Sequence, residues 1–221
     1  MNKLRDYQRE DVEFLKKLET AGCFNEPRTG KTPTALVVFS EKQIQRFIVV
    51  VPSSALYSWA DECSTWTDYP VVVCTGTPLQ KHKIIEEWEQ GALIISYGSL
   101  KEPRTNLLSA ILRKLPDGCI IDEAHRIKDR KSANAETCFA LTTKIPNRLA
   151  LTGTPAPNKP DEIWSILHFL HPNEFKSYWK FVEEFCYIST RLNQQGKPFK
   201  DIGALKPSKV AELQHILNDN A

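Results

Sequence analysis

The amino-acid sequence predicts an α/β fold, a doubly wound and mostly parallel sheet followed by a helical C-terminal extension. Short runs of β-branched and other apolar residues alternate with longer segments in which apolar residues recur every three or four positions. Because the short runs are apolar throughout, both faces of their strands must be buried, as in a parallel sheet with helices on both sides. The composition of the 221 residues, 41% hydrophobic and 25% charged, is typical of globular domains and excludes a disordered or fibrous chain.

Five apolar runs are predicted to be buried strands, and the pair Cys23-Phe24 is predicted to end an earlier strand. The five runs are 46–51, 70–74, 92–96, 119–122 and 148–152. Apolar residues at helical spacing predict helices between these strands, at 56–66, 84–88 and 107–115. In a doubly wound fold, ligands bind at the carboxyl ends of the strands, so we expect the functional site at that edge.

The C-terminal part of the chain has a different pattern, since no strand is predicted after Pro160. The elements expected there are two helices, a polar loop rich in Gly, Pro, Gln and Lys, and a final helix, at 162–170, 175–186, 191–207 and 208–217. We therefore expect a sheet-containing lobe at residues 1–172 and a helical extension at residues 173–221.

Charge and targeting patterns limit the possible partners and location. The 29 Lys and Arg residues against 27 Asp and Glu give a net charge of +2, so a polyanion would have to bind through a local patch. The longest apolar run, 47–51, is far shorter than the ~20 residues of a membrane helix, and the N-terminus does not resemble a signal peptide. We expect a cytoplasmic protein of a bacterium or of a phage-infected host, with no membrane partner. The six cysteines lack metal-ligand spacing and predict buried thiols.

Residues 25–32, Asn-Glu-Pro-Arg-Thr-Gly-Lys-Thr, follow the first predicted strand and open a helix, as a phosphate-binding loop does. In such a loop the backbone N–H groups face the phosphates, Lys31 reaches the β- and γ-phosphates, and Thr32 binds magnesium. An ordinary helix N-cap loop is the alternative for this motif by itself. The predicted cofactors are ATP and Mg2+, bound by Arg28, Thr29, Gly30, Lys31 and Thr32.

A second motif, Asp-Glu-Ala-His at 122–125, stands at the end of a predicted strand. Asp122 is expected to hold Mg2+, usually through water, and Glu123 to orient and deprotonate the attacking water. Adjacent carboxylates more often form a solvated turn, and His125 alone could be a core histidine. The position after an apolar strand, downstream of a phosphate loop, favours catalysis. The predicted catalytic residues are Lys31, Asp122 and Glu123.

Further segments match one known family in the order of its motifs. Residues 122–128 resemble the second motif of Snf-type DNA translocases, DEAH-box members of helicase superfamily two, and residues 149–155 are similar to the third motif. Residues 4–8 match the family's adenine-recognition segment, and residues 50–56 and 94–97 resemble its two DNA-strand segments. The resemblance implies the N-terminal RecA-like, ATP-binding P-loop NTPase lobe of such an enzyme, over residues 1–172.

The resemblance also implies roles for residues outside the two motifs. Arg5 and Gln8 are expected to recognise the nucleotide, with the Gln8 amide pairing with adenine, whereas the pair Tyr7-Gln8 alone would be interpreted as helix surface. The implied partner is DNA, in duplex form, because Snf-type relatives track duplex DNA without strand separation. DNA contacts are implied for Pro52, Ser53, Ser54, Ser96 and Tyr97. Coupling between the ATP site and the third motif is implied for His125, Thr152, Gly153 and Thr154.

The phosphate loop departs from the family pattern, which usually reads Asp-Glu-Met-Gly-Leu-Gly-Lys-Thr. Arg28 replaces a glycine and Pro27 replaces the methionine. Because arginine disfavours positive φ, we expect this position either to be unstrained or to belong to a reshaped loop.

The end of the chain bears on the expected activity. In the family, ATP lies between two RecA-like lobes, and the second lobe supplies arginine fingers and half of the DNA track. Since the chain stops at Ala221, we expect the first lobe alone, whose hydrolysis and translocation require a second lobe in cis or in trans. The alternative is a stand-alone nucleotide- or DNA-binding regulatory module without catalysis.

Overall fold

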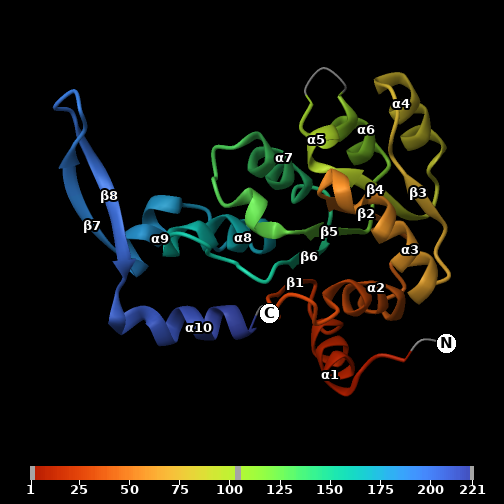
Figure 1. Ribbon diagram of the computed structural model, residues 1–221, viewed down its shortest axis with the longest axis horizontal. Coiled ribbons are helices and arrows are strands. Elements are labelled where there is room, and N and C mark those ends of the chain that lie inside the picture. The colour runs from red at the N-terminus through yellow and green to blue at the C-terminus, as the bar shows by residue number, and fades with distance from the viewer. Residues whose placement is uncertain (1–2, 103–105, 220–221) are drawn as a thin grey trace.

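The centre of the computed structural model, which describes residues 3–102 and 106–219, is a six-stranded sheet (Figure 1). The strands lie in the order β1-β6-β5-β2-β4-β3, and every neighbouring pair is parallel. They are β1 (Thr20–Cys23), β2 (Arg46–Val51), β3 (Val71–Val73), β4 (Gly91–Ser96), β5 (Gly118–Asp122) and β6 (Asn147–Leu151). The predicted parallel α/β fold is confirmed, and each of the five predicted runs matches a strand to within one residue at either end.

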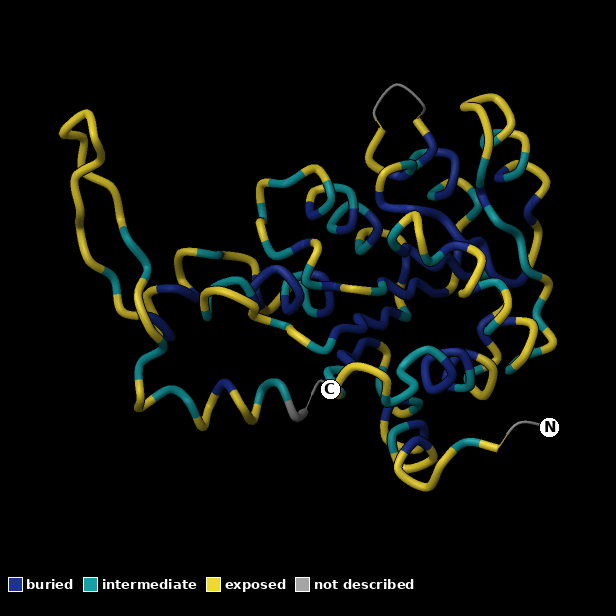
Figure 2. The backbone as a smooth tube through the Cα atoms, viewed as in Figure 1, coloured by how far each residue is buried: buried dark blue, intermediate teal, exposed yellow. Residues whose placement is uncertain are grey.

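Helices cover both faces of the sheet. Successive residues of a strand point to opposite sides, so an apolar strand contributes side chains to both helical layers. In β2, Phe47 and Val49 pack against one helical layer, and Ile48 and Val50 pack against the other. Figure 2 shows the strands as the buried centre of the molecule. The first layer consists of α1 (Asp6–Leu15), α2 (Lys31–Glu41) and α3 (Leu56–Trp66). The second layer consists of α4 (Pro78–Glu87), α5 (Tyr97–Leu100), α6 (Leu107–Arg113), α7 (Ala133–Leu141) and α8 (Ile163–Leu170).

The helix predicted at 84–88 begins earlier than expected. The Thr77 side chain accepts a hydrogen bond from the Gln80 backbone N–H, and the Gln80 side chain accepts one from the Thr77 backbone N–H. This capping box, with Pro78 as the first helical residue, satisfies backbone donors that the start of a helix leaves unpaired. α4 therefore starts at Pro78, in a stretch whose apolar spacing gives no signal.

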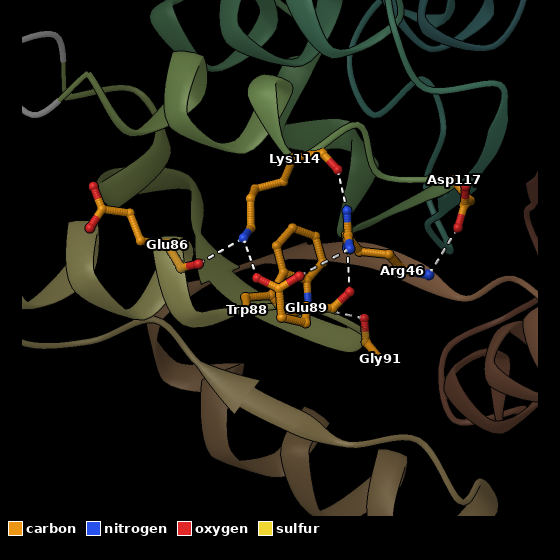
Figure 3. A network of polar contacts seen from close by, with 7 residues as sticks. All are labelled: Arg46, Glu86, Trp88, Glu89, Gly91, Lys114 and Asp117. Carbon is orange, nitrogen blue, oxygen red and sulfur yellow. Dashed lines mark hydrogen bonds and ion pairs between the residues drawn. The ribbon is translucent and has the colours of Figure 1, made fainter.

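A polar network fastens the amino edge of the sheet (Figure 3). The Arg46 guanidinium, at the start of β2, donates to the Glu89 carbonyl over 2.6 Å and to the Lys114 carbonyl. The Lys114 ammonium lies 2.7 Å from the Glu89 carboxylate, and the Asp117 carboxylate accepts the Arg46 backbone N–H over 3.0 Å. The segments that precede β2, β4 and β5 are thus joined to one another, at the edge opposite the expected functional site.

The C-terminal part contains strands that the sequence does not predict. The helices expected there are present as α8, α9 (Tyr178–Phe185) and α10 (Val210–Asp219). The prediction of a polar loop at 191–207 is wrong, because β7 (Cys186–Leu192) and β8 (Pro198–Leu205) form an antiparallel hairpin. Only its base packs on the core, and its outer residues are exposed on both faces. An exposed ribbon lacks the alternation of buried and exposed residues by which strands are predicted.

The turn of this hairpin has a local cause. The Asn193 side-chain oxygen accepts hydrogen bonds from the backbone N–H groups of Gln195 and Lys197, both over 2.9 Å. Gly196 has a φ of 71°, a left-handed conformation that glycine adopts without steric cost. These two residues reverse the chain between β7 and β8.

The cysteines and the helices of the described residues bear on the expected thiols and on a membrane segment. All six cysteines are buried and unpaired, as predicted, and burial raises the pKa of both Cys63 and Cys138 to about 12. Within residues 3–102 and 106–219, no helix is long and apolar enough to cross a membrane. Over the same residues, His, Cys, Asp and Glu side chains form no cluster able to bind a metal by themselves.

Candidate functional site

A cleft of about 420 Å³ opens at the carboxyl edge of the sheet. Strands β1, β6 and β5 are adjacent, so the segments that follow them meet at this edge. The phosphate loop follows β1, residues 122–125 follow β5, and residues 152–154 follow β6. The predicted site residues that the structure brings together around the cleft are Arg28, Gly30, Lys31, Thr32, Asp122, Glu123, Gly153 and Thr154.

Two residues of the phosphate loop have left-handed backbone conformations. Gly30 precedes α2 with a φ of 82°, and Arg28 has a φ of 67° in the same left-handed region. Arg28 therefore occupies a conformation that favours glycine, so the expectation of an unstrained position is wrong. The Lys31 ammonium donates to the carbonyls of Asn25 and Glu26, both over 2.9 Å. Lys31 thus satisfies the loop's own backbone in this structure.

The N-terminal helix supports the same loop. The buried Gln8 amide nitrogen donates to the carbonyls of Thr29 and Gly30 over 3.2 and 3.3 Å, and the Tyr7 hydroxyl donates to the Thr29 carbonyl over 2.8 Å. The Gln8 side-chain oxygen accepts the Arg5 backbone N–H over 2.8 Å. A Cβ added at Gly30 would lie 2.2 Å from the Gln8 amide nitrogen, so this contact requires glycine. Gln8 therefore lies beside the phosphate loop with Arg5 hydrogen-bonded to it, and the nucleotide contacts of both residues stay predictions.

The Asp122 carboxylate is held by two donors. One oxygen accepts the Trp59 indole N–H over 2.8 Å, and the other accepts the Glu123 backbone N–H over 2.8 Å. The Tyr97 hydroxyl donates to the Asp122 carbonyl, also over 2.8 Å. The helical spacing of Trp59 predicts a core residue and carries no signal of a partner 63 residues away. Trp59 is thus a part of the site that sequence reasoning misses.

Helix α3 contributes a second unpredicted side chain. Glu62 lines the cleft one turn after Trp59, and its carboxylate accepts the Trp66 indole N–H over 2.7 Å. Glu62 is distant in sequence from both motifs, 25–32 and 122–125, so neither motif indicates that it belongs to the site.

A chain of polar contacts links the second motif to β6. The His125 Nδ1 atom lies 3.2 Å from the Glu123 carboxylate and 3.1 Å from the Thr152 hydroxyl. An Nδ1 that carries a proton can donate to Glu123 or to Thr152, whereas an Nδ1 without a proton can only accept from the Thr152 hydroxyl. The buried Thr152 hydroxyl also accepts the Thr154 backbone N–H over 3.1 Å. This geometry is compatible with coupling between the two segments.

Gly153 brings β6 close to the phosphate loop. A Cβ at this position would lie 2.9 Å from the Cδ of Pro27, closer than real Cβ contacts. Side chains larger than hydrogen would push the two segments apart. The phosphate loop and residues 152–154 therefore pack directly against each other at Gly153.

The residues predicted to contact DNA fall into two groups. Ser53 and Ser54 are exposed in a short 3₁₀ turn before α3, and Pro52 is half-buried. Ser96 and Tyr97 are only 5% and 4% exposed, so their side chains are turned into the protein, and the DNA contacts at all five residues stay predictions. The Ser96 hydroxyl caps α5, and the Tyr97 hydroxyl holds Asp122. Burial also raises the pKa of Tyr97 well above its usual value.

Comparisons with known proteins agree with this geometry. The SNF2-related domain family matches residues 7–219 of the chain. Chromodomain-helicase-DNA-binding protein 8 of Danio rerio is 31% identical over 239 residues, and chromodomain-helicase-DNA-binding protein 7 of Gallus gallus is 31% identical over 238 residues. Each alignment covers 99% of this chain but only 9% and 8% of the relative, so the chain spans less than a tenth of these proteins.

A solved structure shows the same fold. The Sulfolobus solfataricus SWI2/SNF2 ATPase core in complex with dsDNA matches with a TM-score of 0.73 and 27% sequence identity. The match covers 83% of this chain and 39% of that chain.

The expected location is wrong. The sequence suggested the cytoplasm of a bacterium or of a phage-infected host, whereas the curated relatives are chromodomain-helicase-DNA-binding proteins of eukaryotes, whose chromosomal DNA lies in the nucleus.

Proposed function

The chain belongs to the SNF2-related domain family, and from this premise we propose that it is the ATP-binding lobe of a DNA-dependent ATPase that translocates on duplex DNA. Hydrolysis and translocation in this proposal require a second RecA-like lobe, in cis or in trans. The observation that carries the proposal is the cleft in which Lys31 and Thr32 of one segment meet Asp122 and Glu123 of another. A regulatory module without catalysis has less support, because such a module has no need of Glu123 beside the phosphate loop.

The donors around the cleft fit Mg2+ and a nucleotide. Mg2+ prefers hydroxyl, carboxylate and phosphate oxygens, which Thr32, Asp122 and a bound nucleotide together offer. Each Asp122 oxygen accepts one hydrogen bond from the protein and keeps a second lone pair. When bound, Mg2+ would neutralise charge on the β- and γ-phosphates. Lys31 would bind the same phosphates once its ammonium leaves the carbonyls of Asn25 and Glu26.

Glu123 is the proposed base of the reaction, since its carboxylate lines the cleft and, among the described residues, forms no ion pair with a lysine or arginine. It would orient the attacking water and accept its proton. His125 would act as a positioning residue, because its Nδ1 atom reaches both Glu123 and Thr152. Charge that develops on the phosphoryl oxygens would be neutralised by an arginine of the second lobe.

The test of the nucleotide site is calorimetry of ATP binding with magnesium, for the wild-type chain and Lys31→Ala. Removing a charge-assisted contact weakens binding by roughly 1.5–3 kcal/mol. Lys42→Ala is a matched control, because this lysine donates to the Leu18 carbonyl at the opposite end of α2. Equal ATP affinities for wild type and Lys31→Ala would contradict the assignment of the phosphate loop.

A further inference from the structure

The outer part of the β7–β8 hairpin projects from one end of the molecule, whereas its base packs on the core. Figure 1 shows the two blue strands extending away from the sheet, and Figure 2 shows their outer part as exposed. Ile188, Ile202 and Leu205, near the base, pack against the core. Toward the turn, Leu192 and Phe199 are 69% and 45% exposed. A two-stranded ribbon is only marginally stable by itself, so the exposed outer part is held by its base.

The outer part of this hairpin carries concentrated positive charge. We call residues 190–200 the hairpin tip. These residues contain Arg191, Lys197 and Lys200 and no carboxylate, whereas the whole chain has a net charge of only +2. Arg191 pairs with Asp201 over 2.8 Å and Lys200 pairs with Glu183 over 3.4 Å. Both cations are more than half exposed, and exposed pairs of this kind contribute little, so a stronger anion can replace the carboxylates.

We propose that the hairpin tip is a DNA-binding element that contacts the phosphate backbone of duplex DNA. The charge of the tip complements a duplex, which presents one negative charge per ~1.7 Å of helix axis. The shape fits too, because the major groove admits a two-stranded β-ribbon. The amide side chains of Gln194 and Gln195, also in the tip, are suited to hydrogen bonds with phosphate and sugar oxygens. The identity of the partner, duplex DNA, rests on the proposed function. The contact proposed here is separate from the DNA contacts predicted at residues 52–54 and 96–97.

The test measures the affinity of the full 221-residue chain for a fluorescent duplex by anisotropy, over a series of salt concentrations. The variant combines Arg191→Gln, Lys197→Gln and Lys200→Gln. Each lost phosphate contact makes the plot of log affinity against log salt less steep by about 0.9, so the slope should decrease by about 2–3. A matched control removes the same charges by Lys17→Gln, Arg113→Gln and Lys144→Gln, at exposed positions before β1, β5 and β6. The control should keep the wild-type slope.

Equal slopes for the hairpin variant and the control would overturn the proposal, as would absence of duplex binding by the wild-type chain at low salt. A selective loss of binding to polyglutamate, with duplex binding unchanged, would assign the tip to an acidic protein and also overturn it. A second variant replaces residues 191–199 by an Asn-Gly turn, and it should reproduce the reduced slope. None of these outcomes depends on the ATP affinities of wild type and Lys31→Ala, so failure of the hairpin proposal is distinguishable from failure of the proposed nucleotide site.

Discussion

The hydrogen bond between Trp59 and Asp122 makes Trp59 a part of the candidate site, although the two residues are far apart in sequence. The indole N–H of Trp59 donates a hydrogen bond to the Asp122 carboxylate, which is expected to bind magnesium. Phenylalanine has an aromatic ring but lacks this donor. We predict that Trp59→Phe lowers the free energy of unfolding by about 1–2 kcal/mol and weakens the magnesium dependence of ATP binding. Chemical denaturation and calorimetry at several Mg2+ concentrations measure the two effects.

Trp88→Phe is the matched control for that experiment. Its indole N–H donates to the Gly91 carbonyl over 3.2 Å at the amino edge of the sheet, away from the cleft. The control should lose stability and keep the magnesium dependence of wild type. If both variants change the magnesium dependence equally, Trp59 has no specific effect on Asp122.

Arg28 has a φ of 67°, and this left-handed conformation costs a residue with a side chain about 1–2 kcal/mol. Glycine is free of this cost but loses more entropy on folding, by roughly 0.4–1 kcal/mol. We predict that Arg28→Gly is more stable than Arg28→Ala by up to about 1 kcal/mol, measured by denaturant unfolding. A less stable glycine variant would show that the loop does not hold position 28 in the left-handed region.

Elements differ in how well the sequence predicts them, and burial explains the difference. Strands such as β2 and β5 are buried on both faces, so they are continuous apolar runs that are recognised without further information. The β7–β8 hairpin has exposed outer faces, and its residues between Arg191 and Pro207 have the composition of a loop. In the site, the residues of the two motifs could be predicted because they are adjacent in sequence. Trp59 and Glu62 could not, since only folding brings α3 to the cleft.

The network at the amino edge gives a prediction about pH. The hydrogen bond and charge of Lys114, with Arg46 nearby, lower the pKa of Glu89 below its ordinary value of 4.5. A carboxyl group with a lowered pKa in the folded state stabilises the fold at neutral pH, and this contribution is lost as the pH falls through the folded pKa. Wild type should therefore be more stable than Glu89→Gln at pH 7, and the difference should shrink in acid.

Urea unfolding of both proteins at neutral pH and at a pH below the folded pKa of Glu89 measures this difference. Glu136→Gln, a change of an exposed carboxylate whose side chain is outside the network, is the control. A difference between wild type and Glu89→Gln that is independent of pH would exclude the charge of Glu89 as its source.

At the scale of the whole molecule, the open cleft predicts the activity of the isolated lobe. Arginine fingers supplied by a partner raise phosphoryl-transfer rates by about 10³–10⁵ where they have been measured. Residues 1–221 alone should therefore release phosphate from ATP barely above background, with duplex DNA, with single-stranded DNA or with neither. Addition of a second lobe should raise the rate, and Glu123→Gln should abolish that gain while ATP binding persists. Robust DNA-stimulated turnover by residues 1–221 would show that the chain supplies the missing positive charge itself.

The contacts of Lys31 have a consequence for the energetics of nucleotide arrival. Its ammonium already donates to two carbonyls. A phosphate that entered the cleft would therefore replace these carbonyls as the hydrogen-bond acceptor of Lys31. Only the difference between the two sets of hydrogen bonds contributes to affinity, and the carbonyls of Asn25 and Glu26 compete with every ligand. The two loop carbonyls therefore compete with a phosphate for the Lys31 ammonium. Because they belong to the same molecule, this competition is the same at any protein concentration.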